Sequence, residues 1–211
     1  MKKLCLSLLF VAFGLWASAQ TPLSEAQSRE VMATLTETAA SMQTLQCRFV
    51  QNKTTALLAE PTVSEGTMLY AAPDKMRWEY TTPYHFALVV NGERIARIMD
   101  DKTEVLDAKQ SKMYKSMTDL IIGSASGKKL FDTTVFDITL YDDGATWRAE
   151  MLPLRKDMKR MFAKLVFRFD RKTGVISSVE FVETKGDTTQ IRLEDLRPNI
   201  WPLDESLFIC Q

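Results

Sequence analysis

The sequence predicts an α+β fold in which one long helix is followed by about eleven antiparallel strands. Apolar residues recur at helical spacing over residues 23–46, and after Cys47 they alternate with polar residues at a period of two. Turn residues separate many of the alternating segments, as in an antiparallel meander. Because about eleven strands are too many for one flat sheet, we expect strong curling into a barrel or half-barrel.

The first 19 residues have the pattern of a secretory signal. Lys2 and Lys3 form a cationic start, Leu4–Trp16 is an apolar run, and Ala17-Ser18-Ala19 supplies the small residues of a cleavage site. The run of about 13 apolar residues is shorter than the roughly 20 that cross a bilayer. We therefore expect cleavage after Ala19, export from the cytoplasm, and a single domain over residues 20–211.

The composition is that of an ordinary globular chain. The 211 residues are 45% hydrophobic and 26% charged, with 27 basic and 27 acidic side chains. These values exclude a disordered tail, and without a basic excess we expect no nucleic-acid partner. Removal of Lys2 and Lys3 with the signal would leave 25 basic and 27 acidic side chains, a net charge of −2. We expect a monomer.

Three helical segments are predicted. The first, Leu23–Gln46, begins with Ser24 and Gln27 at capping-box spacing. A second, over residues 112–122, is followed by a Gly- and Ser-containing loop, and a short third helix begins near residue 204. Helices inserted into a meander usually cover one face or one end of the sheet, so the second is a candidate lid. Its apolar face comprises Met113, Met117, Leu120 and Ile121.

The strand-like segments are short and evenly spaced. They cover residues 47–58, 64–71, 75–81, 84–90, 93–99, 103–107, 134–141, 145–152, 161–170, 175–184 and 187–196. Tight hairpins are expected at Asn91-Gly92 and at Asp142-Asp143-Gly144, and a Gly-containing loop is expected at residues 171–174. We expect these segments to pair in sequence order.

Residues for catalysis or metal binding are scarce. His85, the one histidine, lies in a strand pattern, and no His/Cys group has zinc spacing. The acid pairs Asp100-Asp101 and Asp142-Asp143 fall at turns, where Asp is favoured for its local hydrogen bonds. No glycine loop has nucleotide-binding spacing. We expect neither an enzyme nor a cofactor.

Two features leave alternatives open. The run Arg155-Lys156-Asp157-Met158-Lys159-Arg160 is either a solvated loop between strands or a docking surface for an acidic partner or lipid headgroups. Cys47 and Cys210 would be free to pair in an exported protein, or to stay as small buried thiols. Neither alternative is decided by the sequence.

The apolar residues point to a cavity on the concave face of the sheet. Ten Met remain after Met1, and Met68, Met76 and Met99 fall on strand patterns. Any single Met is most simply a core residue. As a group, flexible unbranched side chains fit a cavity that accepts acyl chains.

One block of the sequence resembles the periplasmic outer-membrane lipoprotein carrier protein family. It runs from Ser64-Glu65-Gly66-Thr67 through Met76-Arg77-Trp78 to Pro83, and is followed by Val89-Val90-Asn91-Gly92. The preceding helix and Phe49-Val50-Gln51 are similar to the opening of that family, where a helix leads into an F-x-Q strand. The specific pattern covers residues 41–92, and the rest matches in element order.

The resemblance implies an unclosed antiparallel β-barrel, covered by helices, that holds lipoprotein acyl chains in a hydrophobic cavity. Met76 and Trp78 match wall positions of the family, and residues 113–122 resemble its lid. Ala72 stands where the family commonly has an Arg that links this loop to the lid, so closure would need other contacts. The residues that we expect in the cavity wall are Phe49, Met68, Met76, Trp78, Tyr80, Leu88 and Val90.

The resemblance therefore implies a carrier that takes acylated lipoproteins from an inner-membrane releasing complex to an outer-membrane acceptor. A lipid-binding sensor of the same fold that regulates an envelope partner is the main alternative. A secreted hydrolase would need a nucleophile and a base that the sequence does not display.

Overall fold

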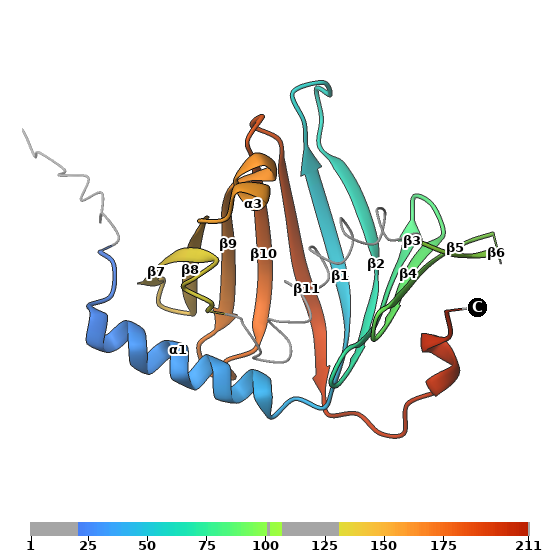
Figure 1. Ribbon diagram of the computed structural model, residues 1–211, viewed down its shortest axis with the longest axis horizontal. Coiled ribbons are helices and arrows are strands. Elements are labelled where there is room, and N and C mark those ends of the chain that lie inside the picture. Colours follow the sequence, from blue (N-terminus) through green and yellow to red (C-terminus); the bar gives the residue numbers. More distant parts are fainter. Residues whose placement is uncertain (1–20, 101, 107–130, 211) are drawn as a thin grey trace, which may run out of the picture.

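The computed structural model describes residues 21–100, 102–106 and 131–210 (Figure 1). Eleven antiparallel strands form one sheet in the order β6-β5-β4-β3-β2-β1-β11-β10-β9-β8-β7. The sheet curls strongly, while β6 and β7 remain at its two edges (Figure 1). The predicted unclosed antiparallel sheet and its strand number are confirmed.

Each predicted strand is present, with shifts of a few residues at the ends. The first six strands are β1 (Thr44–Thr54), β2 (Thr62–Ala71), β3 (Lys75–Thr82), β4 (Phe86–Asn91), β5 (Arg94–Met99) and β6 (Lys102–Val105). The other five are β7 (Phe136–Asp142), β8 (Thr146–Pro153), β9 (Phe162–Asp170), β10 (Ile176–Glu183) and β11 (Thr188–Pro198). The turns at Gly92, Gly144 and Gly174 have positive φ angles, which explains why glycine occupies them.

The first and the last strand in the sequence pair with each other at the centre of the sheet. β1 pairs with β2 on one side and with β11 on the other, so that Phe49 lies opposite both Gly66 and Leu193. Each half of the sheet is otherwise a meander of sequence neighbours. The expected pairing in sequence order is therefore wrong at one place, because β6 and β7 lie at opposite edges of the sheet and β1 pairs with β11. The concave face is therefore built from two meanders that meet at β1 and β11.

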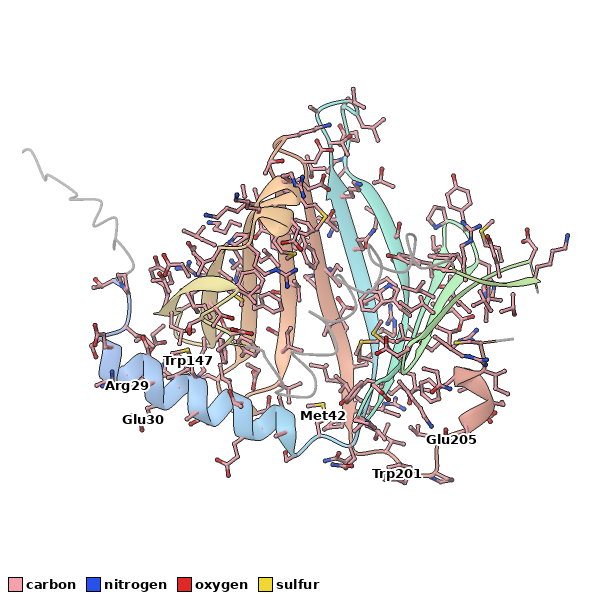
Figure 2. The ribbon with its side chains drawn as sticks, viewed as in Figure 1. Arg29, Glu30, Met42, Trp147, Trp201 and Glu205 are labelled. Carbon is pink, nitrogen blue, oxygen red and sulfur yellow. The ribbon has the colours of Figure 1, made fainter. Side chains whose placement is uncertain are left out.

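Helix α1 (Glu25–Ala40) lies along the lower end of the sheet in Figure 1. The predicted capping box is present, because the Ser24 side chain accepts from the backbone of Gln27 and the Gln27 side chain accepts from the backbone of Ser24. Val31, Leu35 and Ala39 are buried on the inner face of the helix, whereas Arg29 and Glu30 lie on the exposed side (Figure 2).

The prediction that this helix continues to Gln46 is wrong. The helix ends at Ala40, and Thr44–Gln46 already belong to β1. Met42 and Leu45 are buried as expected, but Leu45 pairs with Tyr70 of β2 and Pro198 of β11. Pairing in the sheet therefore overrides a helical spacing that the sequence continues past the true end of the helix.

Two short helices complete the described part. The 3-10 helix η1 (Glu205–Phe208), predicted near residue 204, packs Phe208 on the convex side of the sheet in a small cluster with Val89 and Ala96. Helix α3 (Lys156–Met161) connects β8 and β9. The interpretation of its charge run as a solvated loop is wrong, because Lys156–Met161 form a helix in which Met158 is buried against the sheet.

Candidate functional site

The seven predicted wall residues lie together on the concave face of β1–β4. Cross-strand pairing places Trp78 between Met68 and Leu88, and Met76 between Tyr70 and Val90. Six of the seven are buried, with exposed fractions between 0 and 7%, and Tyr80 is half-buried. The structure brings together Phe49, Met68, Met76, Trp78, Tyr80, Leu88 and Val90. Their role in ligand binding stays a prediction.

Aromatic rings run in series across this part of the wall. Phe49 stacks on Trp78 with ring centroids 4.1 Å apart, and the rings of Phe49 and Tyr80 meet edge to face with centroids 5.1 Å apart. Tyr80 stacks in turn on Phe86 at 5.6 Å, and its hydroxyl donates to Oε1 of Gln51. The rings therefore form a continuous apolar surface from the centre of the sheet to β4.

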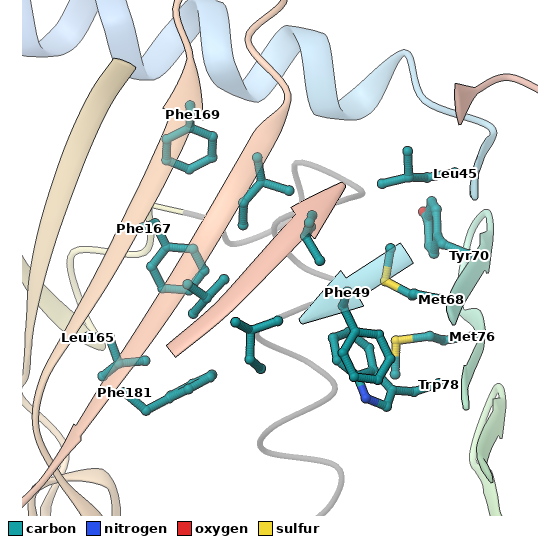
Figure 3. Close-up of a cluster of buried hydrophobic side chains, with 14 of the residues drawn as sticks. Leu45, Phe49, Met68, Tyr70, Met76, Trp78, Leu165, Phe167, Phe169 and Phe181 are labelled. Atoms are coloured by element: carbon teal, nitrogen blue, oxygen red, sulfur yellow. The ribbon is translucent and has the colours of Figure 1, made fainter. Parts of the chain in front are cut away.

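A second apolar surface, on β8–β10, faces the first from the opposite side of the curled sheet (Figure 3). Strand pairing sets Phe167 beside Ala149 and Val179, and Leu165 beside Met151 and Phe181. These side chains were not among the predicted wall residues, although the alternation of Leu165, Phe167 and Phe169 was visible in the sequence. Only the curvature of the sheet shows that this apolar strand face turns toward Trp78. We call the two surfaces together the inner wall.

A pocket of about 440 Å³ opens at the upper edge of the inner wall. Tyr80 and Phe86 belong to both the wall and the pocket, and Met99 adds an apolar side chain. Arg97 lines the pocket as well and forms an ion pair with Glu104 of β6. The complete lining is Ser64, Tyr80, Thr82, Pro83, Tyr84, His85, Phe86, Arg97 and Met99.

Charged groups lie outside the inner wall. His85 is exposed at the β3–β4 turn, where its Nε2 is 2.9 Å from Oε1 of Glu79. Arg77 donates to the other carboxylate oxygen of Glu79 at 2.8 Å, and this bond is the main cause of the lowered pKa of Glu79. Asp142 and Asp143 lie at the predicted β7–β8 turn. Among the described residues, no group of three or more His, Cys, Asp or Glu could hold a metal ion.

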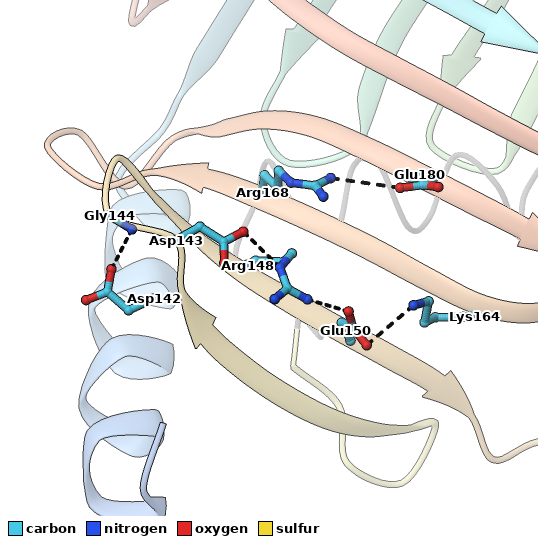
Figure 4. A network of polar contacts seen from close by, with 8 residues as sticks. All are labelled: Asp142, Asp143, Gly144, Arg148, Glu150, Lys164, Arg168 and Glu180. Carbon is cyan, nitrogen blue, oxygen red and sulfur yellow. Dashed lines mark hydrogen bonds and ion pairs between the residues drawn. The ribbon is translucent and has the colours of Figure 1, made fainter. Parts of the chain in front are cut away.

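The convex side of β8–β10 carries a chain of ion pairs instead (Figure 4). Buried Arg148 donates through Nε to Asp143 at 2.8 Å and through Nη1 to Glu150, and Glu150 also pairs with Lys164. The guanidinium of Arg148 lies 4.0 Å from the ring centroid of Tyr141. Ion pairs link neighbouring segments on this polar side of the sheet, whereas the inner wall is apolar.

The two cysteines are free thiols in separate buried clusters. Cys47 lies in the main core, while Cys210 packs with Val89 and Ala96 on the convex side. Burial raises the pKa of Cys47 to about 12 and also raises that of Cys210. The sequence left open whether the two cysteines form a disulfide or stay as buried thiols, and the structure shows two buried thiols.

The lid expectation concerns residues outside the described part of the chain: Met113, Met117, Leu120 and Ile121. Ala72 is described. Its N–H donates to the carbonyl oxygen of Gln43 at 2.8 Å, and its side chain packs against the main core. The β2–β3 turn is therefore held to the segment between α1 and β1 by the backbone at the position of the expected Arg.

Comparison with known proteins decides the family. The family model described as outer membrane lipoprotein carrier protein LolA matches residues 40–211. The chain belongs to the LolA family. An outer-membrane lipoprotein carrier protein of Methylibium petroleiphilum is 25% identical over 176 residues, which are 83% of each chain. The resemblance of residues 41–92 to the lipoprotein carrier family is thereby confirmed.

Solved structures share the fold of this LolA-family chain at low sequence identity. An uncharacterized conserved protein from Thermus thermophilus is 9% identical, has a TM-score of 0.53, and matches 86% of this chain and 92% of its own. The complex of MucA and MucB from Pseudomonas aeruginosa contains a chain that is 12% identical, with a TM-score of 0.50. That match covers 86% of this chain and 60% of the other. No helix in the described ranges is long and apolar enough to cross a membrane.

Proposed function

We propose that the protein is a periplasmic carrier that binds lipoprotein acyl chains on its inner wall and moves them from the inner to the outer membrane. Membership of the LolA family and the carrier name of the Methylibium relative support this proposal. The observation that carries it is the apolar inner wall, on which aromatic and Met side chains converge from both halves of the sheet.

The chemistry of the wall suits transport without catalysis. Each CH₂ group removed from water contributes about 0.8 kcal/mol, so even partial shielding of an acyl chain gives a substantial gross stabilisation. The aromatic and thioether groups offer no directional bonds that would hold one chain geometry. Cargo would be retained by its apolar area and released when an acceptor offers an equivalent apolar surface.

The partners in this proposal are acylated lipoproteins, an inner-membrane complex that releases them and an outer-membrane acceptor. The main alternative is a lipid-binding sensor that regulates an envelope protein. This alternative is supported by the fold that the protein shares with a chain of the MucA/MucB complex. The two proposals differ in the ligand that the protein carries when it is purified from its native envelope.

The decisive experiment is native mass spectrometry of the protein purified from that envelope. Bound lipoprotein supports the carrier, whereas free lipid alone supports the sensor. The Trp78→Glu and Phe181→Glu variants place a charge on opposite parts of the inner wall, which costs several kcal/mol unless water enters. We expect both to lose cargo.

Gln46→Glu is the matched control, because Gln46 is exposed and lies with Arg48 and Arg197 around a pocket outside the inner wall. This variant should carry cargo like the wild type. Circular dichroism checks that all three variants fold. If the folded wall variants still carried normal amounts of cargo, the inner wall would not be the binding site.

A further inference from the structure

One end of the sheet gathers several exposed cations and leucines. The antiparallel order brings α3, the β10–β11 turn and the β1–β2 loop to the end opposite α1 (Figure 1). Hydrogen bonds join the three segments, because Ala56 N donates to Oδ1 of Asp187 and Thr184 Oγ1 donates to the carbonyl oxygen of Arg160. We call residues 55–58, 152–160 and 184–187 the α3 rim.

The cations of the α3 rim point to solvent. Burial of Met158 against the main core leaves Lys156, Lys159 and Arg160 on the exposed faces of α3, and Lys185 is exposed on the adjoining turn. In the described part of the chain these four have no ion-pair partner within 4.0 Å. The acids within the rim are both engaged, since Asp157 pairs with Arg155 at 2.6 Å and Asp187 accepts from Ala56. A chain with formal net charge zero thus has a local positive surface.

Leucines protrude beside these cations. Leu57, at the tip of the β1–β2 loop, is 94% exposed, and its neighbour Leu58 is 54% exposed. Leu152 and Leu154 are about half-exposed where β8 leads into α3. Single exposed leucines are ordinary on protein surfaces. Four of them at the same end of the sheet as four exposed cations are instead typical of an amphipathic membrane-surface segment.

The arrangement fits a lipid surface better than a protein partner. The centre of a protein interface is depleted in Lys and built from pockets that aromatic or Arg side chains fill. Here the leucines stand on the β1–β2 loop and at the end of β8, and the lysines lie on the adjoining helix α3 and β10–β11 turn. Lys and Arg can hold their charge at lipid phosphates while their aliphatic stems lie along apolar groups.

We propose that the α3 rim docks on the headgroup region of an anionic phospholipid membrane. The cations of α3 bind lipid phosphates, and Leu57 and Leu58 enter the boundary between headgroups and acyl chains. The rim lies at the same end of the sheet as the pocket beside Tyr80 and Phe86. The inference goes beyond carriage of lipoproteins, and its test needs no lipoprotein.

The test is flotation of the protein with phospholipid vesicles. Vesicles with about 30% phosphatidylglycerol in phosphatidylcholine should bind the wild type, and pure phosphatidylcholine vesicles should bind it at least about tenfold more weakly. High salt should release the protein from the anionic vesicles, because about 1 M salt shortens the screening length to about 3 Å. Equal binding to both kinds of vesicle, or no binding to either, overturns the proposal. The absence of any binding would favour a protein partner for the rim.

Two variants locate the contact. Lys156→Glu/Lys159→Glu should lower binding to anionic vesicles at least about tenfold. Its control, Arg94→Glu/Lys172→Glu, reverses two exposed cations at the opposite end of the sheet and should bind like the wild type. Leu57→Ser/Leu58→Ser should weaken binding to the anionic vesicles at low salt, with Ile209→Ser as its exposed apolar control. Wild-type binding by both folded rim variants would refute the assignment.

Discussion

Gly66 lies directly beneath the ring of Phe49, its cross-strand partner on β1. A Cβ atom at Gly66 would be 2.6 Å from Cζ of Phe49 and 1.9 Å from the carbonyl oxygen of Glu79. The missing side chain allows Phe49 to lie flat across β2 and to stack on Trp78. One glycine in the middle of a strand therefore determines the shape of the inner wall.

Replacement of this glycine should destabilise the protein. Because the backbone of β3 would have to move, we expect Gly66→Ala to lower the free energy of unfolding by about 3 kcal/mol. Thr67→Ala, next to it on the exposed side of β2, should cost less than about 1 kcal/mol. Urea unfolding followed by circular dichroism measures both. Equal losses for the two variants would contradict the close approach.

We expect a similar contrast in stability between two variants of arginines, one at buried Arg148 on the convex side and one at an exposed arginine. Arg148→Ala would leave Asp143 and Glu150 without their shared cation, and we expect a loss of about 3 kcal/mol. Arg192→Ala removes an exposed pair with Glu194 at 3.5 Å and should change stability by less than about 1 kcal/mol. Denaturant midpoints of the two variants test this. A loss below about 1 kcal/mol for Arg148→Ala would show that the buried network adds little.

Glu79 should make stability depend on pH. The hydrogen bond from Arg77 lowers its pKa in the folded state, with a further lowering from His85. The carboxylate therefore stabilises the fold above its unfolded pKa of about 4.3, and this contribution is lost as the pH falls through the lower folded value. The wild type should exceed Glu79→Gln in unfolding free energy near about pH 7, and the difference should shrink toward about pH 3. A difference that stays constant with pH would exclude this role.

The two buried cysteines should be unreactive in the folded protein. Because burial raises both pKa values, that of Cys47 to about 12, little thiolate is present near neutral pH. An iodoacetamide time course read by peptide mass spectrometry should show slow modification of both in buffer and fast modification in guanidinium chloride. Rapid labelling of Cys47 in buffer would show that β1 and β2 open readily. Failure of both to react in denaturant would indicate a disulfide.

The sequence predicted most of the fold because strand alternation and turn chemistry are local signals. Asn91-Gly92 and Asp142-Asp143-Gly144 mark hairpins, and Trp78 alternates with Arg77 and Glu79 along its strand. The predicted end of the first helix was wrong because Leu45 fits the apolar face of a helix and the apolar face of a strand equally well. Its true place depends on Tyr70 and Pro198, which are distant in sequence.

The candidate site was only half predicted for a related reason. Met76 and Trp78 could be recognised within a family-like block, whereas Phe167 and Phe181 belong to strands that matched in element order alone. Their place opposite Trp78 follows from sheet curvature, which is a property of the whole sheet. Helix α3 was missed because its six residues carry mainly charges, and only the burial of Met158 gives the segment an inner face.

The pairing of β1 with β11 sets the order in which the molecule can fold. Phe49 and Leu193 are neighbours in the centre of the sheet although 144 positions separate them. Each meander can form locally, but closing so long a loop is entropically costly and slow. A chain that has emerged only as far as β10 has two unjoined half-sheets with exposed edges at β1 and β10. The last strand, β11, therefore joins the two half-sheets. A chain that is synthesised from its N-terminus can form the complete inner wall only after Thr188–Pro198 has been released.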